Sequence, residues 1–297
     1  MDEMKLDPII VKTPMADISW VKRMYLDVPY GTESKAQVLD IYLPDEGDGP
    51  FPLVVHIHGG GFAFGDKRDD HMNAYLTGIK EGFAVASVEY RLSGEAIFPA
   101  AVLDCRAAIR FLKEHAVEYK IDPARIAPIG GSAGGNLAAM LAMNVPNGQF
   151  PGEENLALPE TSPCVKTAVA QFGPMHFSTM EEQARANGIS ATHENPADMP
   201  ESAYVGGNIG PETADLVEQA NPANYASPDM CPILVQHGTR DHLVPFEQSR
   251  EFVEAVADKA GADKITYVPL VAADHEDKRF FSGENMALVW DYLKKHL

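Results

Sequence analysis

The sequence predicts an α/β fold in which a mostly parallel central sheet carries helices on both faces. Short apolar runs alternate with longer segments of helical period, several runs are continuously β-branched, and turn-forming residues separate them. Strand-then-helix order requires crossover connections, which make successive strands parallel.

The first elements follow this order. Val38–Leu43 alternates apolar and polar residues and ends at a Pro-Asp-Glu-Gly turn, which predicts an exposed strand. Leu53–His58 is continuously apolar or β-branched, as expected for a strand covered on both faces, and Ala84–Val88 is a second such run. A helix is predicted over Ala100–His115, because its apolar residues recur with helical spacing.

The second half of the chain repeats the pattern. Ile126–Ile129 is a short apolar strand, and a helix-forming segment, Asn136–Met143, comes soon after it. The remaining predicted elements are the strands Val165–Phe172, Ile233–His237 and Ile265–Leu270 and the helices Phe246–Lys259 and Met286–His296.

Residues 173–230 interrupt this rhythm, because the segment is too long for a simple connector. Within it, Glu181–Arg185 and Thr213–Glu218 are candidate helices. We expect a single domain over residues 1–297, with residues 173–230 as a cap-like insertion over the active site. The polar stretch 146–163 is either a second such insertion or a surface loop, two interpretations of equal weight.

Composition excludes several classes of partner. The chain has 24 Lys and Arg against 43 Asp and Glu, a net charge of −19, which disfavours nucleic acid and anionic membrane surfaces. Three cysteines make neither a disulfide framework nor a CxxC metal pair. The first residues carry acids where a signal peptide carries bases, and no apolar run reaches membrane-spanning length. The sequence therefore predicts a cytoplasmic protein without a membrane span, and it predicts no oligomeric state.

A serine lies at the predicted strand-to-helix turn Gly130-Gly131-Ser132-Ala133-Gly134. A sharp turn at this place exposes the serine Oγ beside a helix N-terminus, whose free N–H groups favour developing negative charge. The alternative, a phosphate-binding loop, lacks the Lys-Ser/Thr pair of a P-loop, and GxGxxG is absent. Ser132 is therefore the candidate nucleophile.

Three consecutive glycines follow the strand Leu53–His58, in His58-Gly59-Gly60-Gly61-Phe62. A tight turn needs only one glycine, whereas three allow backbone N–H groups to point into a cavity. Such donors stabilise the oxyanion that forms in acyl transfer, by roughly 3–4 kcal/mol each. The loop is therefore a candidate oxyanion hole.

Asp241 and His275 are the candidate acid and base. Each follows a predicted strand by a short loop, at the carboxyl edge where open parallel sheets place their sites. The chain order Ser132, Asp241, His275 is that of strand-turn-helix serine hydrolases.

Other histidines and acids compete for these roles. His176 and His237 also lie near strand ends and replace His275 if the strand register differs. Asp274 and His242 are expected to be bystanders, because the side chains of adjacent residues diverge along the backbone.

A metal site is not expected. His56 and His58 share one face of a strand, but no third ligand follows at a suitable spacing. His58 is expected instead to brace the glycine loop by hydrogen bonds.

Five motifs in order resemble the α/β-hydrolase family: HGGGF at 58–62, YRLSGEAIFPAAVLDC at 90–105, IDPARI at 121–126, GGSAGG at 130–135 and HGTRDHLVP at 237–245. The resemblance covers residues 36–297. The branch is that of hormone-sensitive-lipase-like bacterial esterases, in particular those described as bifunctional feruloyl and acetyl xylan esterases. The sequence departs from that branch at Gly131, where an acidic residue or histidine is commoner, and Pro128 stands in a predicted central strand.

The resemblance implies a carboxylic-ester hydrolase with Ser132 as nucleophile, His275 as base and Asp241 as its orienting acid. It also implies that the backbone N–H groups of Gly60, Gly61 and Ala133 form the oxyanion hole. Neither a metal nor a cofactor is expected, and the partner is a small ester. Two alternatives stay open: a non-catalytic small-molecule receptor of the same fold, and a lipase- or peptidase-type serine hydrolase.

Overall fold

The computed structural model describes residues 14–189 and 199–297. One eight-stranded sheet has the strand order β1-β2-β4-β3-β5-β6-β7-β8. β1 pairs with β2, and β2 with β4, in antiparallel fashion, whereas all other neighbours are parallel. The predicted α/β class and the mostly parallel sheet are confirmed.

The strands are β1 (Arg23–Pro29), β2 (Val38–Leu43), β3 (Phe51–Ile57), β4 (Ala84–Val88), β5 (Ile121–Gly131), β6 (Ala168–Gln171), β7 (Ile233–Gly238) and β8 (Ile265–Leu270). The α-helices are α1 (Met72–Tyr75), α2 (Ala100–Glu114), α3 (Ala133–Ala142), α4 (Phe177–Ala186), α5 (Pro200–Val205), α6 (Ala214–Gln219), α7 (Glu247–Ala260) and α8 (Gly283–His296).

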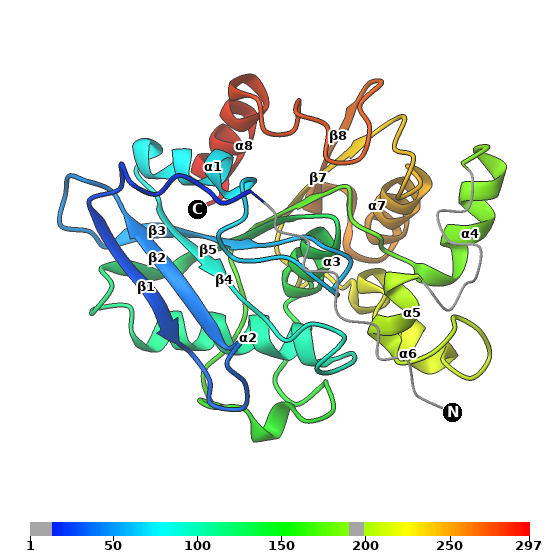
Figure 1. Cartoon of the computed structure of the whole chain (residues 1–297), viewed down its shortest axis with the longest axis horizontal. Coiled ribbons are helices and arrows are strands. Elements are labelled where there is room, and N and C mark those ends of the chain that lie inside the picture. Colours follow the sequence, from blue (N-terminus) through cyan, green and yellow to red (C-terminus); the bar gives the residue numbers. More distant parts are fainter. Residues whose placement is uncertain (1–13, 190–198) are drawn as a thin grey trace, which may run out of the picture.

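Helices cover both faces of the sheet because consecutive strand residues point to opposite sides. On one face Val55 packs in a cluster with Ile109 of α2 and Leu137 of α3. On the other face Val54 belongs to a cluster that includes Trp290 of α8. Figure 1 shows α1 and α8 on one side of the strands and α2 on the other. The central strands are therefore covered on both faces.

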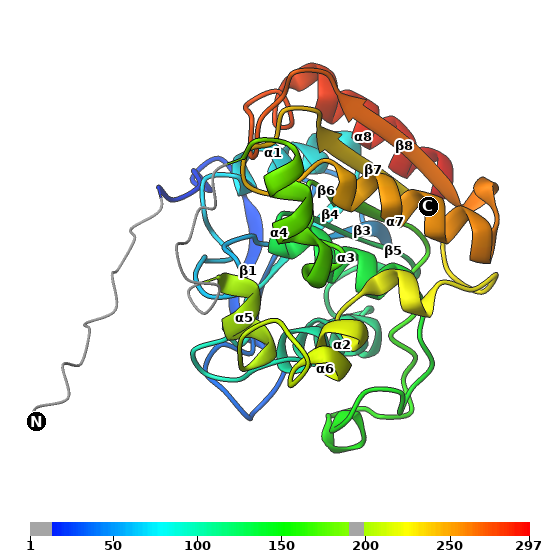
Figure 2. The same cartoon turned by 90° about the vertical axis from the view of Figure 1, so that its right-hand side faces the viewer.

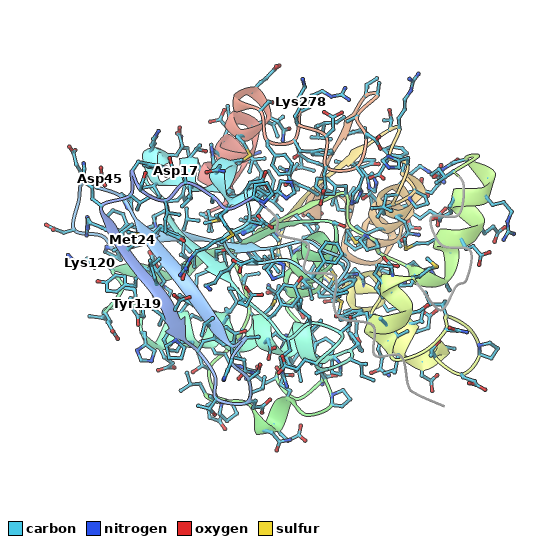
Figure 3. The ribbon with its side chains drawn as sticks, in the orientation of Figure 1. Asp17, Met24, Asp45, Tyr119, Lys120 and Lys278 are labelled. Atoms are coloured by element: carbon cyan, nitrogen blue, oxygen red, sulfur yellow. The ribbon has the colours of Figure 1, made fainter. Side chains whose placement is uncertain are left out.

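The strand Val38–Leu43 is present as predicted, but the expectation that it is exposed is wrong. β2 lies between β1 and β4, and five of its six residues are buried. Leu39, Ile41 and Leu43 pack in the cluster on one face of the sheet, and Tyr42 packs in the cluster on the other face. β1 (Arg23–Pro29), an unpredicted strand, takes the edge position beside β2 and leaves most of its own side chains in solvent. Figure 3 places Met24 of β1 at this outer edge of the sheet.

β5 is longer than predicted and contains Pro128. The predicted strand Ile126–Ile129 extends to Ile121–Gly131, so Asp122-Pro123 lies inside the strand. Pro128 pairs with Val55 of β3, while pairing with β6 begins only at Ile129. Pro128 therefore stands where β5 has one paired neighbour, and its missing N–H need not interrupt a ladder.

The two predicted insertions differ in position. In 146–163, Glu153 forms ion pairs with Arg106 and Arg110 of α2, and all three side chains are buried. This segment lines no part of the cavity at Ser132.

The segment 173–230 carries α4, α5 and α6. α4 contains the predicted helix Glu181–Arg185, and α6 matches the predicted helix Thr213–Glu218 shifted by one residue. These helices lie at the end of the molecule opposite β1 in Figure 1 and face the viewer in Figure 2. Residues 190–198 of this segment, and residues 1–13, lie outside the described residues. In the described part of the chain, no helix combines the length and the apolar character needed to cross a bilayer.

Candidate functional site

Ser132 occupies the turn between β5 and α3. Its backbone has φ 55° and ψ −124°, a strained conformation for a residue with a side chain. A hydrogen bond of 3.0 Å from the Ser132 N–H to the Gln171 carbonyl of β6 holds the turn. The Ser132 side chain is directed to the cavity described below and the residue is 8% exposed.

The neighbouring glycines are required by close packing. A Cβ atom on Gly134 would overlap the carbonyl oxygen of Ile57 in β3. A Cβ on Gly131 would lie 2.6 Å from Cζ of Phe172, so the family's commoner side chains do not fit here. The departure at Gly131 therefore has a steric reason in this chain.

The structure brings the three predicted side chains together. His275 Nε2 lies 3.1 Å from Ser132 Oγ, and His275 Nδ1 lies 2.7 Å from Asp241 Oδ2. Asp241 follows β7 and His275 follows β8, so the parallel sheet places both loops at the edge where β5 ends. This geometry allows His275 to accept the Ser132 proton while Asp241 holds the other ring nitrogen.

Asp241 is held as a carboxylate. Its Oδ1 accepts hydrogen bonds from the N–H groups of Leu243 and Val244, at 2.9 and 2.8 Å. Burial raises the pKa of Asp241, but hydrogen bonds and charge from His237 and His275 outweigh burial and hold the pKa well below its usual range. The lowered pKa keeps Asp241 ionised at neutral pH.

His237 is a second histidine on this carboxylate. Its Nε2 lies 3.2 Å from Asp241 Oδ2 and 3.0 Å from the Val244 carbonyl, and its Nδ1 lies 2.7 Å from Ser249 Oγ. A carbonyl can only accept, so Nε2 carries a proton and the Ser249 hydroxyl donates to Nδ1. The sequence left His237 as an alternative base to His275, whereas in the structure His237 contacts the Asp241 carboxylate and holds it in position.

We expect His237→Leu to lower kcat for 4-nitrophenyl acetate by about 10-fold, roughly 1.4 kcal/mol of barrier. Loss of the Nε2–H donor frees one lone pair of Asp241 and lets the carboxylate tilt away from His275. His237→Gln keeps a donor and is expected to recover part of the rate. His242→Gln, which changes an exposed histidine of the same loop, is the matched control. Equal losses in His237→Leu and His242→Gln contradict a positioning role.

The glycine loop presents free backbone donors. Gly60 and Gly61 have φ of 105° and 57°, which glycine adopts readily. Neither of their N–H groups donates a hydrogen bond within the part of the chain that the structure describes. Ala133 is the first residue of α3, where an N–H has no acceptor inside the helix. Gly60 and Gly61 line the same cavity as Ser132, and Ala133 follows Ser132 in the chain.

His58 braces this loop from a fully buried position. Its Nδ1 lies 2.7 Å from the Gly59 carbonyl and its Nε2 lies 3.0 Å from Glu89 Oε1. Both partners are acceptors, so both contacts need the doubly protonated ring. Burial lowers the pKa of His58, but the Glu89 carboxylate and the Gly59 carbonyl more than compensate, and the net pKa is raised.

We expect Glu89→Gln to lower the free energy of unfolding by about 1–3 kcal/mol at pH 6 and by less at pH 9. The raised pKa of His58 contributes stability that is complete below its unfolded pKa and is lost as pH rises through the folded pKa. Urea unfolding at both pH values measures the difference. Glu81→Gln, which removes an exposed ion pair with Lys294 and no histidine contact, is the control. An effect of Glu89→Gln that is the same at both pH values argues against a cationic His58.

The remaining candidates lie outside this arrangement. Asp274 and His242 do not join the triad, but Asp274 accepts hydrogen bonds from the His242 ring and N–H and from the His275 N–H, so it ties the two loops together. His176 bonds to Glu218 near the surface.

His56 forms a hydrogen bond with Ser87 and stacks on Tyr75. Within residues 14–189 and 199–297, no group of three or more His, Cys, Asp or Glu side chains is arranged to hold a metal ion.

Two residues that surround this site could not be identified from the sequence. Phe172, which follows β6, packs edge-on against the His275 ring at 5.0 Å between centroids and shields it. Its place at the end of a predicted strand was the available clue. Glu201 of α5 reaches the cavity from a segment that sequence reasoning left without detail.

A cavity of about 180 Å³ opens onto Ser132 and His275. Its apolar walls come from three parts of the chain: Phe64 of the glycine loop, Met180 and Met199 of the segment 173–230, and Leu243 and Val244 of the loop after Asp241. It is a small and mostly apolar chamber with the serine hydroxyl exposed to it.

Known proteins are similar to this chain in sequence and in fold. The BD-FAE family model matches residues 39–256. Esterase LipQ and the probable carboxylic ester hydrolase LipM, both of Mycobacterium tuberculosis, are 29% and 30% identical to it, over 84% of this chain and 56% and 55% of their own lengths. The chain thus spans about half the length of these curated relatives. A solved structure described as a truncated form of carbohydrate esterase from gut microbiota has a TM-score of 0.82 and 28% identity, and covers 95% of this chain and 99% of that chain.

These matches agree with the resemblance drawn from the motifs. The family model spans most of the sheet, and the structural match extends over nearly the whole of both chains. The strand order, the serine turn and the chain order of the site are those of the α/β-hydrolase fold. The chain has this fold and belongs to the BD-FAE family.

Proposed function

We propose that the protein is a serine carboxylesterase with Ser132 as nucleophile, His275 as general base and Asp241 as the acid that orients it. The observation that carries the proposal is the continuous set of contacts from Asp241 Oδ2 through both nitrogens of His275 to Ser132 Oγ. Relatives described as an esterase and a probable carboxylic ester hydrolase match 84% of this chain in sequence.

In the first half of the reaction, Ser132 Oγ attacks the ester carbonyl carbon as His275 Nε2 takes the hydroxyl proton. The carbonyl electron pair moves onto oxygen, and the N–H groups of Gly60, Gly61 and Ala133 stabilise the oxyanion. The oxyanion then re-forms the carbonyl and breaks the bond to the alcohol oxygen, which leaves with the proton held on His275.

In the second half, water attacks the acyl-enzyme. His275 accepts a proton from the water, the same N–H groups stabilise the second oxyanion, and Ser132 leaves with that proton. The products are the carboxylic acid and free enzyme. Side chains, backbone amides and water supply every group that these steps use.

We propose small esters as substrates, in particular acetyl or feruloyl esters of plant carbohydrates. A match described as a carbohydrate esterase supports the carbohydrate part, and membership of the BD-FAE family supports the ester class. The cavity of about 180 Å³ is smaller than the roughly 300–1,000 Å³ of sites for drug-sized ligands. The size of the cavity favours acetyl over feruloyl or octanoyl groups.

A fluorophosphonate probe tests the proposed activity, because it phosphonylates only an activated serine. The probe is expected to label the wild-type protein on the peptide that carries Ser132 and to leave Ser132→Ala unlabelled. Acetyl, butyryl and octanoyl 4-nitrophenyl esters and methyl ferulate then define the substrate, with kcat/KM expected to be highest for acetyl. An unlabelled wild-type protein supports the receptor alternative, and labelling at another residue contradicts the assignment of Ser132.

A further inference from the structure

Glu201 is a buried carboxylate in the wall of the active-site cavity that the proposed mechanism does not use. It is 6% exposed and lines the cavity together with Ser132 and His275. Glu276 is the other carboxylate of the wall, and it is exposed to solvent.

The contacts on either side of Glu201 fix its position. Pro200 lies against the glycine loop so closely that a Cβ on Gly61 would come within 2.7 Å of Pro200 Cβ. Tyr204, one turn further along α5, stacks on Phe62 with ring centroids 3.8 Å apart. Glu201 follows Pro200 directly and is three residues before Tyr204, and residues three apart lie on one side of a helix. The contacts of Pro200 and Tyr204 therefore hold Glu201 near the glycine loop.

The Glu201 carboxylate has no polar partner among the residues that the structure describes. Within residues 14–189 and 199–297, no hydrogen bond or ion pair joins it to another residue. Burial raises the pKa of Glu201, and its own N–H and the nearby His275 offset only part of this effect. A buried carboxyl without a partner costs free energy, which a ligand able to hydrogen-bond to it recovers.

The chemistry of the wall limits what that ligand can be. Among the described residues that line the cavity none is Lys or Arg, so a substrate carboxylate finds no cation there and meets Glu201 instead. A hydroxyl group suits Glu201 in either protonation state, because it can both donate and accept. Apart from Ser132, His275 and the exposed Glu276, the other side chains of the wall are apolar, so Glu201 is the buried side chain of the wall that the proposed mechanism leaves free to bind a hydroxyl.

We propose that Glu201 is the specificity-determining residue of the cavity: it hydrogen-bonds a hydroxyl group close to the reacting ester and excludes esters that carry a carboxylate there. This inference rests on the proposed esterase function. It adds to that function a chemical class of substrate, neutral hydroxylated esters, and a residue that selects it.

Two substrate pairs that differ by one hydroxyl group test the inference on both sides of the ester. 2-Hydroxyethyl acetate and propyl acetate probe the alcohol side, and ethyl 3-hydroxybutyrate and ethyl 3-methylbutyrate probe the acyl side. The wild-type protein is expected to show a higher kcat/KM for the hydroxylated member of at least one pair. Glu201→Met, similar in length but unable to bind a hydroxyl, is expected to reduce that preference by roughly 10-fold to 100-fold.

A second variant separates charge from hydrogen bonding. Glu201→Gln keeps a hydrogen-bonding group, so it is expected to retain most of the hydroxyl preference while raising kcat/KM for monoethyl succinate relative to ethyl valerate. Glu276→Gln removes an exposed carboxylate at the same cavity and is the matched control, with the wild-type preference expected. Thermal unfolding of Glu201→Met is expected at or above the wild-type Tm, because an unpaired buried carboxylate is replaced by an apolar group.

The outcomes are distinguishable. A wild-type protein that hydrolyses none of these esters, nor 4-nitrophenyl acetate, contradicts the proposed function. A wild-type esterase whose preference in both pairs is the same in Glu201→Met contradicts the role of Glu201 alone. A fall in the Tm of Glu201→Met with unchanged substrate preference shows that the carboxylate serves the fold.

Discussion

Replacing Ser132 by alanine is expected to lower kcat for 4-nitrophenyl acetate by about 10⁶-fold, roughly 8 kcal/mol of barrier. The variant keeps His275, Asp241 and the N–H groups of the glycine loop, but no acyl-enzyme forms. Residual hydrolysis above the rate in water is expected, because the oxyanion donors still act on a bound ester. Steady-state rates and the absence of an acyl-enzyme mass measure the effect.

The strained backbone at Ser132 provides a control that separates catalysis from folding. Alanine has the same penalty at φ 55° as serine, so Ser132→Ala is expected to keep the wild-type Tm. Glycine adopts this conformation readily, so Ser132→Gly is expected to be inactive yet at least as stable as the wild type. A Ser132→Ala variant that stays folded and keeps more than a tenth of the wild-type kcat refutes the assignment of Ser132 as the nucleophile.

Elements defined by local pattern could be predicted from the sequence. The runs Ala84–Val88 and Ile265–Leu270 coincide with β4 and β8 residue for residue. Ala84–Val88 is continuously apolar and fully buried, whereas Ile265–Leu270 is a strand whose residues are half-buried or exposed. Ser132, Asp241 and His275 could be paired without a structure because each follows a strand. Parallel strands bring their carboxyl ends to one edge of the sheet, so residues that follow these strands are expected to lie close together although they are far apart in the sequence.

Features that depend on distant packing could not be predicted in this way. The burial of Val38–Leu43 depends on side chains that cover both faces of the sheet, and these come from distant parts of the chain. The role of His237 depends on the path of the loop that brings Asp241 and Val244 back over it. Glu201 carries no motif in the sequence, and its burial accompanies a contact between Pro200 and Gly61 that joins segments far apart in the chain.

The same limit explains why a triad is easier to predict than a substrate. The three residues of the proposed triad follow the ends of three parallel strands, whereas the cavity wall is assembled from the glycine loop, the loop after Asp241 and α4 and α5. No local spacing rule relates these segments. The residues that select a substrate therefore emerge only when the tertiary contacts of the inserted segment are known.

Replacing Asp241 by asparagine is expected to lower kcat by about 10⁴-fold with little change in KM. The N–H groups of Leu243 and Val244 both point at Oδ1, so the amide oxygen of the introduced side chain must take that place. The amide NH₂ then faces His275 Nδ1 and forces this nitrogen to be an acceptor. The proton moves to Nε2, which can no longer accept the proton of Ser132. Rates with 4-nitrophenyl acetate across pH 5–9 measure the loss.

Asp274→Asn is the matched control for this tautomer argument, because Asp274 also contacts His275 but only through the backbone N–H. An amide oxygen at this position can still accept that bond, so kcat is expected to fall by less than about 10-fold. Losses of similar size in the two variants contradict the argument, since they show that the position of the loop, and not the proton on His275, limits the reaction. Both variants remove one negative charge from the same two loops, so a general effect of charge would appear in both. A loss confined to Asp241→Asn, with an unchanged Tm, therefore assigns the effect to the tautomer of His275.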